Sequence, residues 1–132
     1  MMNKAYEFLK EVGTFYIATV DGEKPKVRPF GAVNVFEDKL YIVTNNTKPT
    51  FRQIKANPNI EICGVNAQGQ WLRIAAKAVV DERVEAKKAM LDTNPGLRNM
   101  YNENDGLVEV LYLKDATAIL SSFTAAPEVW NF

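Results

Sequence analysis

The residues best suited to binding a ligand stand directly after an apolar run that ends at Val43. This block combines hydroxyl, amide and ammonium groups around a proline: Thr44, Asn45, Thr47, Lys48, Pro49 and Thr50. Proline fits the first turn of a helix, whose leading N–H groups are unpaired and carry a partial positive charge. Together with Lys48, those N–H groups would suit a phosphate. An ordinary helix cap beside an exposed lysine is the competing interpretation.

Two further stretches carry candidate binding residues. Arg28 stands before Pro29 and Phe30 in an extended stretch, and its guanidinium could grip a phosphate or a ring carbonyl. A solvated strand arginine is an equally ordinary interpretation. Trp71 could offer a flat wall for a ring-shaped ligand, with Arg73 two residues on and on the same strand face. Packing in a core or an interface is the more common role of a tryptophan.

The composition excludes several catalytic chemistries. The 132 residues include no histidine and one cysteine, Cys63. Ser–His and Cys–His nucleophile pairs, histidine-ligated or cysteine-rich metal sites and internal disulfides therefore cannot be built, and no metal site is expected. Proton transfer would fall to Lys, Tyr or a carboxylate, unless a borrowed cofactor brings its own reactivity. No residue is assigned a catalytic role from the sequence.

The charges of the chain balance. Lys plus Arg and Asp plus Glu each number 16, so the formal net charge at pH 7 is zero. A neutral chain exerts no overall attraction on nucleic acid or on a membrane surface. No apolar run approaches the length of a membrane span. We therefore expect a cytoplasmic protein, where a lone thiol stays reduced, without nucleic-acid or membrane partners.

Local patterns predict a single domain over residues 1–132. Apolar residues at helical spacing predict helices over 3–12, 50–57 and 83–92, with a short helical turn at 97–101. Runs rich in β-branched and aromatic residues predict strands over 14–20, 25–36, 40–44, 60–65, 71–80, 107–113 and 117–122. The last two are either separate strands or one long strand kinked near 114–115. Prolines in 25–36 favour an edge position or a bulge for that strand.

This order of elements predicts a mainly β, α+β fold. About six strands interrupted by a few helices are typical of a small β-barrel with added helices. A sandwich is disfavoured, because helices interrupt the series of strands. The chain ends in Trp130 and Phe132, which either fray or need a place to bury, such as a partner subunit.

The order of the blocks resembles that of the pyridoxamine 5'-phosphate oxidase-like FMN-binding split barrels, and most of all the small Nim-like flavoproteins. The resemblance is carried by three stretches: FYIATVDGEKPKVRPFG at 15–31, LYIVTNNTKPTFRQIKANPNIEI at 40–62 and WLRIAAKAVV at 71–80. The second stretch is the most specific. In this family, a strand ending in Thr-Asn, then a lysine, then a helix closed by Asn-Pro holds the flavin phosphate.

The resemblance implies a split β-barrel that binds FMN as a homodimer, with FMN at the subunit interface. It implies a phosphate site at Lys48, with hydroxyl and amide groups nearby from Thr44, Asn45, Thr47 and Thr50. The ribityl and ring region would be lined by Arg28, Pro29 and Phe30. Trp71 and Arg73 would lie on a strand near the cofactor or the dimer seam.

The implied function is that of an oxidoreductase, which passes electrons from a reduced nicotinamide or similar donor to a small-molecule acceptor. The larger oxidases of the family use a histidine for the pyridoxal substrate, and the Nim proteins carry one near the cofactor. This chain has no histidine, so neither specific activity is implied. A non-catalytic flavin-, haem- or redox-sensing module on the same fold is an alternative. A more remote one is an OB-like barrel for single-stranded nucleic acid, against which the zero net charge argues.

Overall fold

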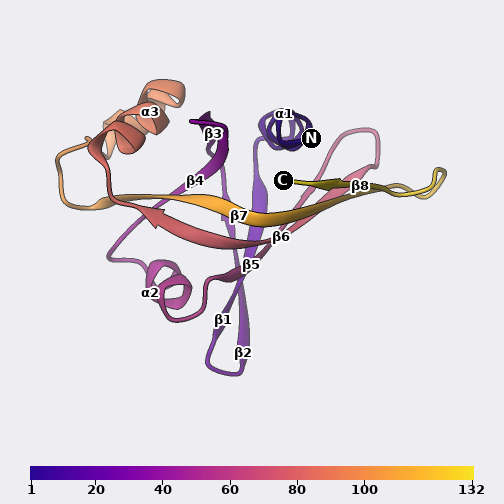
Figure 1. The fold of residues 1–132 in the computed structure, drawn as a ribbon, viewed down its shortest axis with the longest axis horizontal. Coiled ribbons are helices and arrows are strands. Elements are labelled where there is room, and N and C mark those ends of the chain that lie inside the picture. Colours follow the sequence, from indigo (N-terminus) through magenta and orange to yellow (C-terminus); the bar gives the residue numbers. More distant parts are fainter.

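The computed structural model describes residues 1–132 as one eight-stranded antiparallel sheet with three α-helices and a short 3-10 helix (Figure 1). The elements follow one another as α1 (Met2–Val12), β1 (Phe15–Asp21), β2 (Lys24–Phe30), β3 (Val33–Phe36), β4 (Lys39–Asn45), α2 (Pro49–Ala56), β5 (Asn59–Val65), β6 (Trp71–Asp81), α3 (Val84–Thr93), η1 (Pro95–Asn99), β7 (Val108–Ser121) and β8 (Glu128–Asn131). The predicted fold class is confirmed: the chain is a mainly β split barrel with helices added. None of the helices has both the length and the apolar character needed to cross a bilayer.

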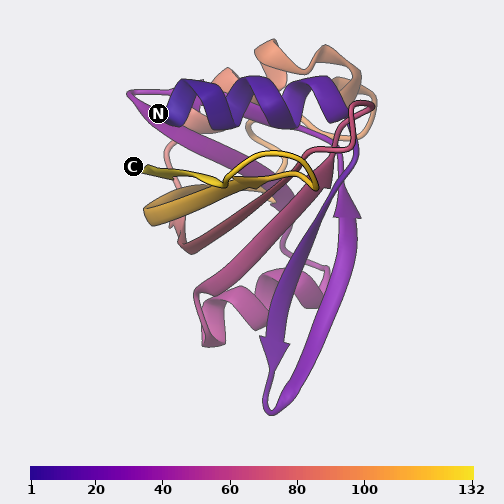
Figure 2. The same ribbon diagram turned by 90° about the vertical axis from the view of Figure 1, so that its right-hand side faces the viewer.

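The strands run in the order β2-β1-β5-β6-β7-β4-β3, and β8 adds to β7. β2 and β3 follow each other in the chain, yet they stand at opposite ends of this order and do not pair. The barrel is therefore split between them, and only the short link through Gly31 and Ala32 joins its two edges. α1 packs against β3, β4 and β5, while the β1–β2 hairpin projects past α2 (Figure 2).

The prediction of one strand over 25–36 was wrong, because the chain breaks there into β2 and β3. Phe30 still pairs with Phe15 of β1, whereas Val33 already pairs with Ile42 of β4. The two halves thus belong to different neighbours, which local residue patterns cannot reveal. The expected edge position is confirmed for β2, where the two prolines lie in a strand with only one neighbour.

The stretch predicted as either two strands or one kinked strand is the single strand β7. Asp115 adopts a left-handed conformation with φ 52°, and the pairing of β6 with β7 shifts register between Ala75 and Lys77. Such an irregularity bends a strand and increases its twist. The bend lets β4 and β8 share one edge of β7, at residues 108–112 and 117–120 respectively.

The tail forms β8, and Trp130 is buried within its own chain. Its side chain is 5% exposed in the barrel core, and the Lys4 ammonium lies 5.7 Å from its ring centroid. Two backbone hydrogen bonds between Ala116 and Phe132 continue the pairing with β7. The aromatic tail is therefore neither frayed nor in need of a partner subunit for burial.

Two apolar clusters hold the elements together. The larger fills the barrel beneath α1, and the smaller lies under α3, where Ala86 and Met90 pack on Ala32 and Tyr41. The smaller cluster matters for function because it docks α3, and with it η1, over the link between β2 and β3. In Figure 1, α2 and α3 lie on the left-hand side of the molecule, one below and one above the strand ends there.

A polar network closes the end of the smaller cluster. The buried Tyr41 hydroxyl donates to Asp81 Oδ2 at 2.7 Å, and Arg83 donates to both Asp81 and Glu37. Hydrogen bonds from Arg83 hold the pKa of Asp81 down at about 2. Burial, reinforced by the neighbouring Asp81, raises the pKa of Tyr41 above its ordinary value. The network ties β4, β6 and the start of α3 to the β3–β4 turn.

Candidate functional site

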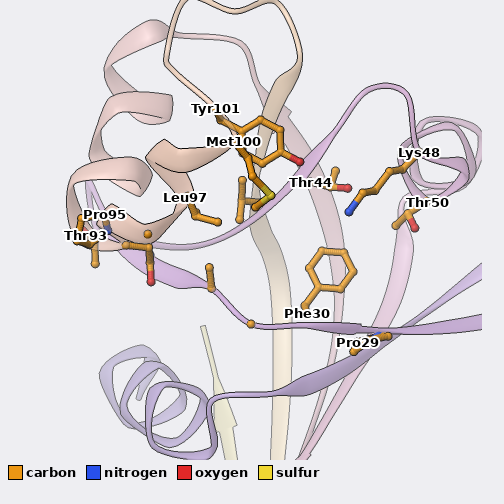
Figure 3. Close-up of a pocket in the computed structure, with 15 residues that line it drawn as sticks. Pro29, Phe30, Thr44, Lys48, Thr50, Thr93, Pro95, Leu97, Met100 and Tyr101 are labelled. Carbon is orange, nitrogen blue, oxygen red and sulfur yellow. The ribbon is translucent and has the colours of Figure 1, made fainter.

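A cavity of about 560 Å³ opens between the start of α2 and the α3–η1 segment (Figure 3). This volume falls within the range of small-molecule sites, roughly 300–1,000 Å³. Three parts of the chain line it: the β2–β3 link at 29–32, the end of β4 with the start of α2 (Val43, Thr44, Lys48, Thr50), and the α3–η1 wall (93–97, Met100 and Tyr101). The split in the barrel thus forms the floor of the cavity.

One side of the cavity is polar. The Lys48 side chain extends toward Thr44 there, with Thr50 beside it, and Lys48 is the only charged side chain in the lining (Figure 3). The two threonines are each 5% exposed, and neither hydroxyl has a partner within the protein. Both residues line the cavity and neither oxygen is fully buried, because the only fully buried side-chain atoms without a hydrogen-bond partner are those of Asn34. Buried hydroxyls normally have partners, so these two are available to a ligand.

The start of α2 strengthens the polar side. Lys48 occupies the position before the helix in an extended conformation, and Pro49 opens the first turn. Lysine cannot accept a hydrogen bond, so no side chain caps the leading N–H groups. These groups and the helix dipole favour an anion at this point. The cavity lining contains no carboxylate that would oppose one.

The other side of the cavity is apolar. Phe30 is 9% exposed, and its ring stacks on Phe15 of the core at a centroid distance of 6.3 Å. Across from it stand Leu97 and Met100, and Met100 is 65% exposed at the rim. A rigid aromatic floor opposite an aliphatic wall suits a flat ring system.

Sequence reasoning missed the whole α3–η1 wall, although it predicted a helical turn at 97–101. The wall is held by Asn94, whose Nδ2 donates to the Val33 carbonyl at 3.0 Å. Pro95-Gly96 marked a turn in the sequence but gave no sign that the turn faces Lys48, which lies about a third of the chain earlier. Only the docking of α3 on the sheet brings the two together.

Half of the predicted binding residues meet in the cavity: Pro29, Phe30, Thr44, Lys48 and Thr50. Asn45 and Thr47 lie behind this lining. Asn45 Oδ1 accepts the Thr47 backbone N–H at 3.0 Å, and Asn45 Nδ2 donates to the Tyr101 hydroxyl at 2.8 Å. These two residues thus shape the loop that carries Lys48 and reach across to the far wall.

Arg28 points away from the cavity and joins the β1–β2 hairpin to α2. Its guanidinium donates to Thr19 Oγ1 and to Gln53 Oε1, each at 2.7 Å, and to the Ile17 carbonyl at 3.3 Å. Burial lowers the pKa of Arg28, which has no carboxylate partner. In this conformation Arg28 braces the helix that begins beside Lys48.

Trp71 and Arg73 lie on the outer face of the sheet and do not line the cavity. Trp71 pairs with Val65, and its ring centroid is 5.0 Å from that of Phe123. Arg73 pairs with Cys63 and lies 4.0 Å from a Glu61 oxygen. Paired residues of an antiparallel sheet share a face, so these side chains form one outer surface.

Comparison of the chain with known proteins identifies its family. The family model described as pyridoxamine 5'-phosphate oxidase matches residues 1–117. Among curated proteins, no sequence matches the chain. Among solved structures, a NimC/NimA family protein from Clostridium acetobutylicum is 46% identical with a TM-score of 0.97, over 99% of this chain and 92% of that one.

More distant structures share the fold. General Stress Protein 26 from Bacillus anthracis has a TM-score of 0.74 at 17% identity, over 99% of this chain and 98% of its own. A pyridoxamine 5'-phosphate oxidase-related, FMN-binding protein from Nostoc punctiforme has a TM-score of 0.64 at 15% identity, over 99% and 91%. With the family match over most of its length and the NimC/NimA relative along nearly all of it, the chain belongs to the pyridoxamine 5'-phosphate oxidase family, in its Nim-like branch.

Proposed function

We propose that this protein is an FMN-binding flavoprotein. The observation that carries the proposal is the division of one cavity into two sides. A lone ammonium, two unpartnered hydroxyls and a helix start form one side, and Phe30 faces an aliphatic wall on the other. FMN has the matching parts, an anionic phosphate and a flat, largely apolar ring. The family match and the FMN-binding relative from Nostoc punctiforme support this choice.

The residues of the cavity would bind and orient the flavin, which supplies the redox chemistry when bound. Lys48, Thr44 and Thr50 would hold the phosphate, and Phe30 would support the ring. We further propose that the protein is an oxidoreductase, which takes electrons from a reduced nicotinamide or similar donor and passes them to a small molecule. We also propose that the protein is cytoplasmic, where the Cys63 thiol stays reduced.

Flavin binding has a direct test. After incubation with FMN and desalting, the protein is expected to retain yellow colour and to quench flavin fluorescence at about one FMN per chain. Absorbance spectra before and after desalting give the stoichiometry, and heat-denatured protein is the control. A protein that neither retains FMN nor binds it in a titration contradicts the proposal.

A non-catalytic flavin-binding module is the second candidate, and one observation favours it. The cavity lining offers no carboxylate and no histidine, so Lys48 and Tyr101 are its only titratable side chains. Anaerobic addition of NADH or NADPH to the FMN-loaded protein separates the two functions. Bleaching of the flavin absorbance supports the oxidoreductase, and an unchanged spectrum with either donor supports the binding module.

We also propose a homodimer with the flavin at the subunit interface. The outer sheet face supports the homodimer itself, because Tyr16 and Val65 are 50% and 61% exposed there and Phe123 is 93% exposed. Clustered exposed apolar residues are typical of a contact surface. Sedimentation equilibrium is expected to give twice the chain mass, and Val65→Asp to shift the population toward monomer. A wild-type monomer at every concentration contradicts this proposal.

A further inference from the structure

A chain of hydrogen bonds fixes the orientation of the Asn45 amide. The Thr47 backbone N–H lies 3.0 Å from Asn45 Oδ1, and the Thr47 hydroxyl donates to the same oxygen. A backbone N–H can only donate, so the atom facing it must be the amide oxygen. The amide NH2 group of Asn45 therefore points the other way, toward the α3–η1 wall.

The orientation of Asn45 determines the role of the Tyr101 hydroxyl. Asn45 Nδ2 lies 2.8 Å from Tyr101 Oη, and an amide NH2 group has no lone pair to offer. The hydroxyl must therefore accept this hydrogen bond, which leaves its single proton for another partner. No acceptor within the protein receives that proton, and Tyr101 lines the cavity.

The place of Tyr101 indicates what the proton meets. The hydroxyl bonds the residue directly after Thr44, so it lies at the polar side of the cavity, and Figure 3 shows it turned toward Thr44 and Lys48. The apolar side, with Phe30 and Leu97, lies away from it. Since an anion bound by Lys48 would be the nearest strong acceptor, the hydroxyl is set to donate to it.

We propose that Tyr101 donates a hydrogen bond to the flavin phosphate from the wall opposite Lys48. Asn45 is then a positioning residue that acts through Tyr101 without touching the ligand. This inference rests on the proposed FMN function and adds to it a phosphate contact from the α3–η1 segment. The contact would close the cavity over the ligand, since the segment that follows η1 and the start of α2 would bind the same group.

The test removes the Tyr101 hydroxyl and, separately, the phosphate of the ligand. Tyr101→Phe is expected to weaken FMN binding about tenfold, the usual effect of losing a hydrogen bond to a charged group. Binding of riboflavin, which lacks the phosphate, is expected to stay unchanged. Fluorescence titration measures both affinities. Tyr112→Phe, which deletes a hydroxyl outside the cavity, is the matched control and should leave both ligands unaffected.

Each outcome decides between the proposals. If wild-type protein binds neither flavin, the FMN function fails and this inference fails with it. If FMN binds and Tyr101→Phe changes neither affinity, or weakens both flavins equally, only the Tyr101–phosphate contact is wrong. Phosphorus NMR of bound FMN gives an independent readout, because loss of the donor should shift the phosphate resonance in Tyr101→Phe alone. An identical resonance in wild type and variant overturns the inference.

Discussion

Lys48→Ala is expected to weaken FMN binding about 10- to 100-fold, or about 1.5–3 kcal/mol, the worth of a charge-assisted hydrogen bond. Lys48 is the only charged side chain in the cavity, so no second cation compensates for its loss. The substitution is expected to leave folding intact, because the Lys48 side chain makes no capping bond to α2. Fluorescence titration with FMN measures the affinity.

Two controls separate a specific contact from a general effect of charge. Lys55→Ala removes a lysine from the last turn of the same helix, outside the cavity, and should leave the affinity near that of wild type. Added salt should weaken FMN binding to wild type more than to Lys48→Ala, because only wild type retains the ion contact. If Lys48→Ala binds FMN as wild type does, Lys48 is not the phosphate ligand.

Asp81→Ala is expected to lower the free energy of unfolding by about 3 kcal/mol, as in other cases where one partner of a buried polar network is removed. Asp81 is 8% exposed and accepts from both Tyr41 and Arg83, and the Tyr41 hydroxyl would lose its partner inside the cluster beneath α3. Urea denaturation followed by circular dichroism measures the change. Asp92 is the matched control: it also bonds an arginine, Arg98, but it is half exposed, so Asp92→Ala should change stability little.

The same network predicts how stability depends on pH. The pKa of Asp81 falls from 3.8 to about 2 on folding, chiefly because Arg83 donates to its carboxylate. The ionised Asp81 carboxylate therefore contributes its full stabilisation of the folded protein above pH 3.8, and this contribution is lost as the pH falls through about 2. The difference in free energy of unfolding between wild type and Asp81→Ala, measured by urea titration, should therefore shrink as the pH falls from 3.8 to about 2. If this difference stays constant down to pH 2, folding does not lower the pKa of the Asp81 carboxyl.

The individual elements could largely be predicted from the sequence. The three helices lie within a few residues of their predicted ranges, since apolar spacing and the flanking Gly13, Pro49 and Pro95 mark them locally. The stretch at 25–36 could not be predicted as two strands, because its break reflects pairing with β1 on one side and β4 on the other. The tail could not be predicted either, since β8 exists only where β7 offers it an edge.

The candidate site was predictable in part for the same reason. Thr44, Lys48 and Thr50 are close in the chain, so a strand end followed by a helix start brings them together locally. Their opposite wall, including Tyr101, comes from a segment that follows two more strands and another helix. Its position depends on the packing of Ala86 and Met90 beneath α3, a long-range contact without a local signature.

By itself the sequence determined the chemistry available to this protein: no histidine, a single thiol, and one lysine at a strand–helix junction that resembles a flavin phosphate site. The types of residues and their spacing over a few positions are enough to predict these features, because caps, turns and helix starts depend on residues close in the chain. Tertiary structure alone decided which groups face the cavity. It turned Arg28 toward Thr19 and Gln53, placed Trp71 on the outer sheet face, and brought Tyr101 into the cavity that Lys48 lines. Strand order and helix docking set those directions, since they depend on burying apolar faces far apart in the chain.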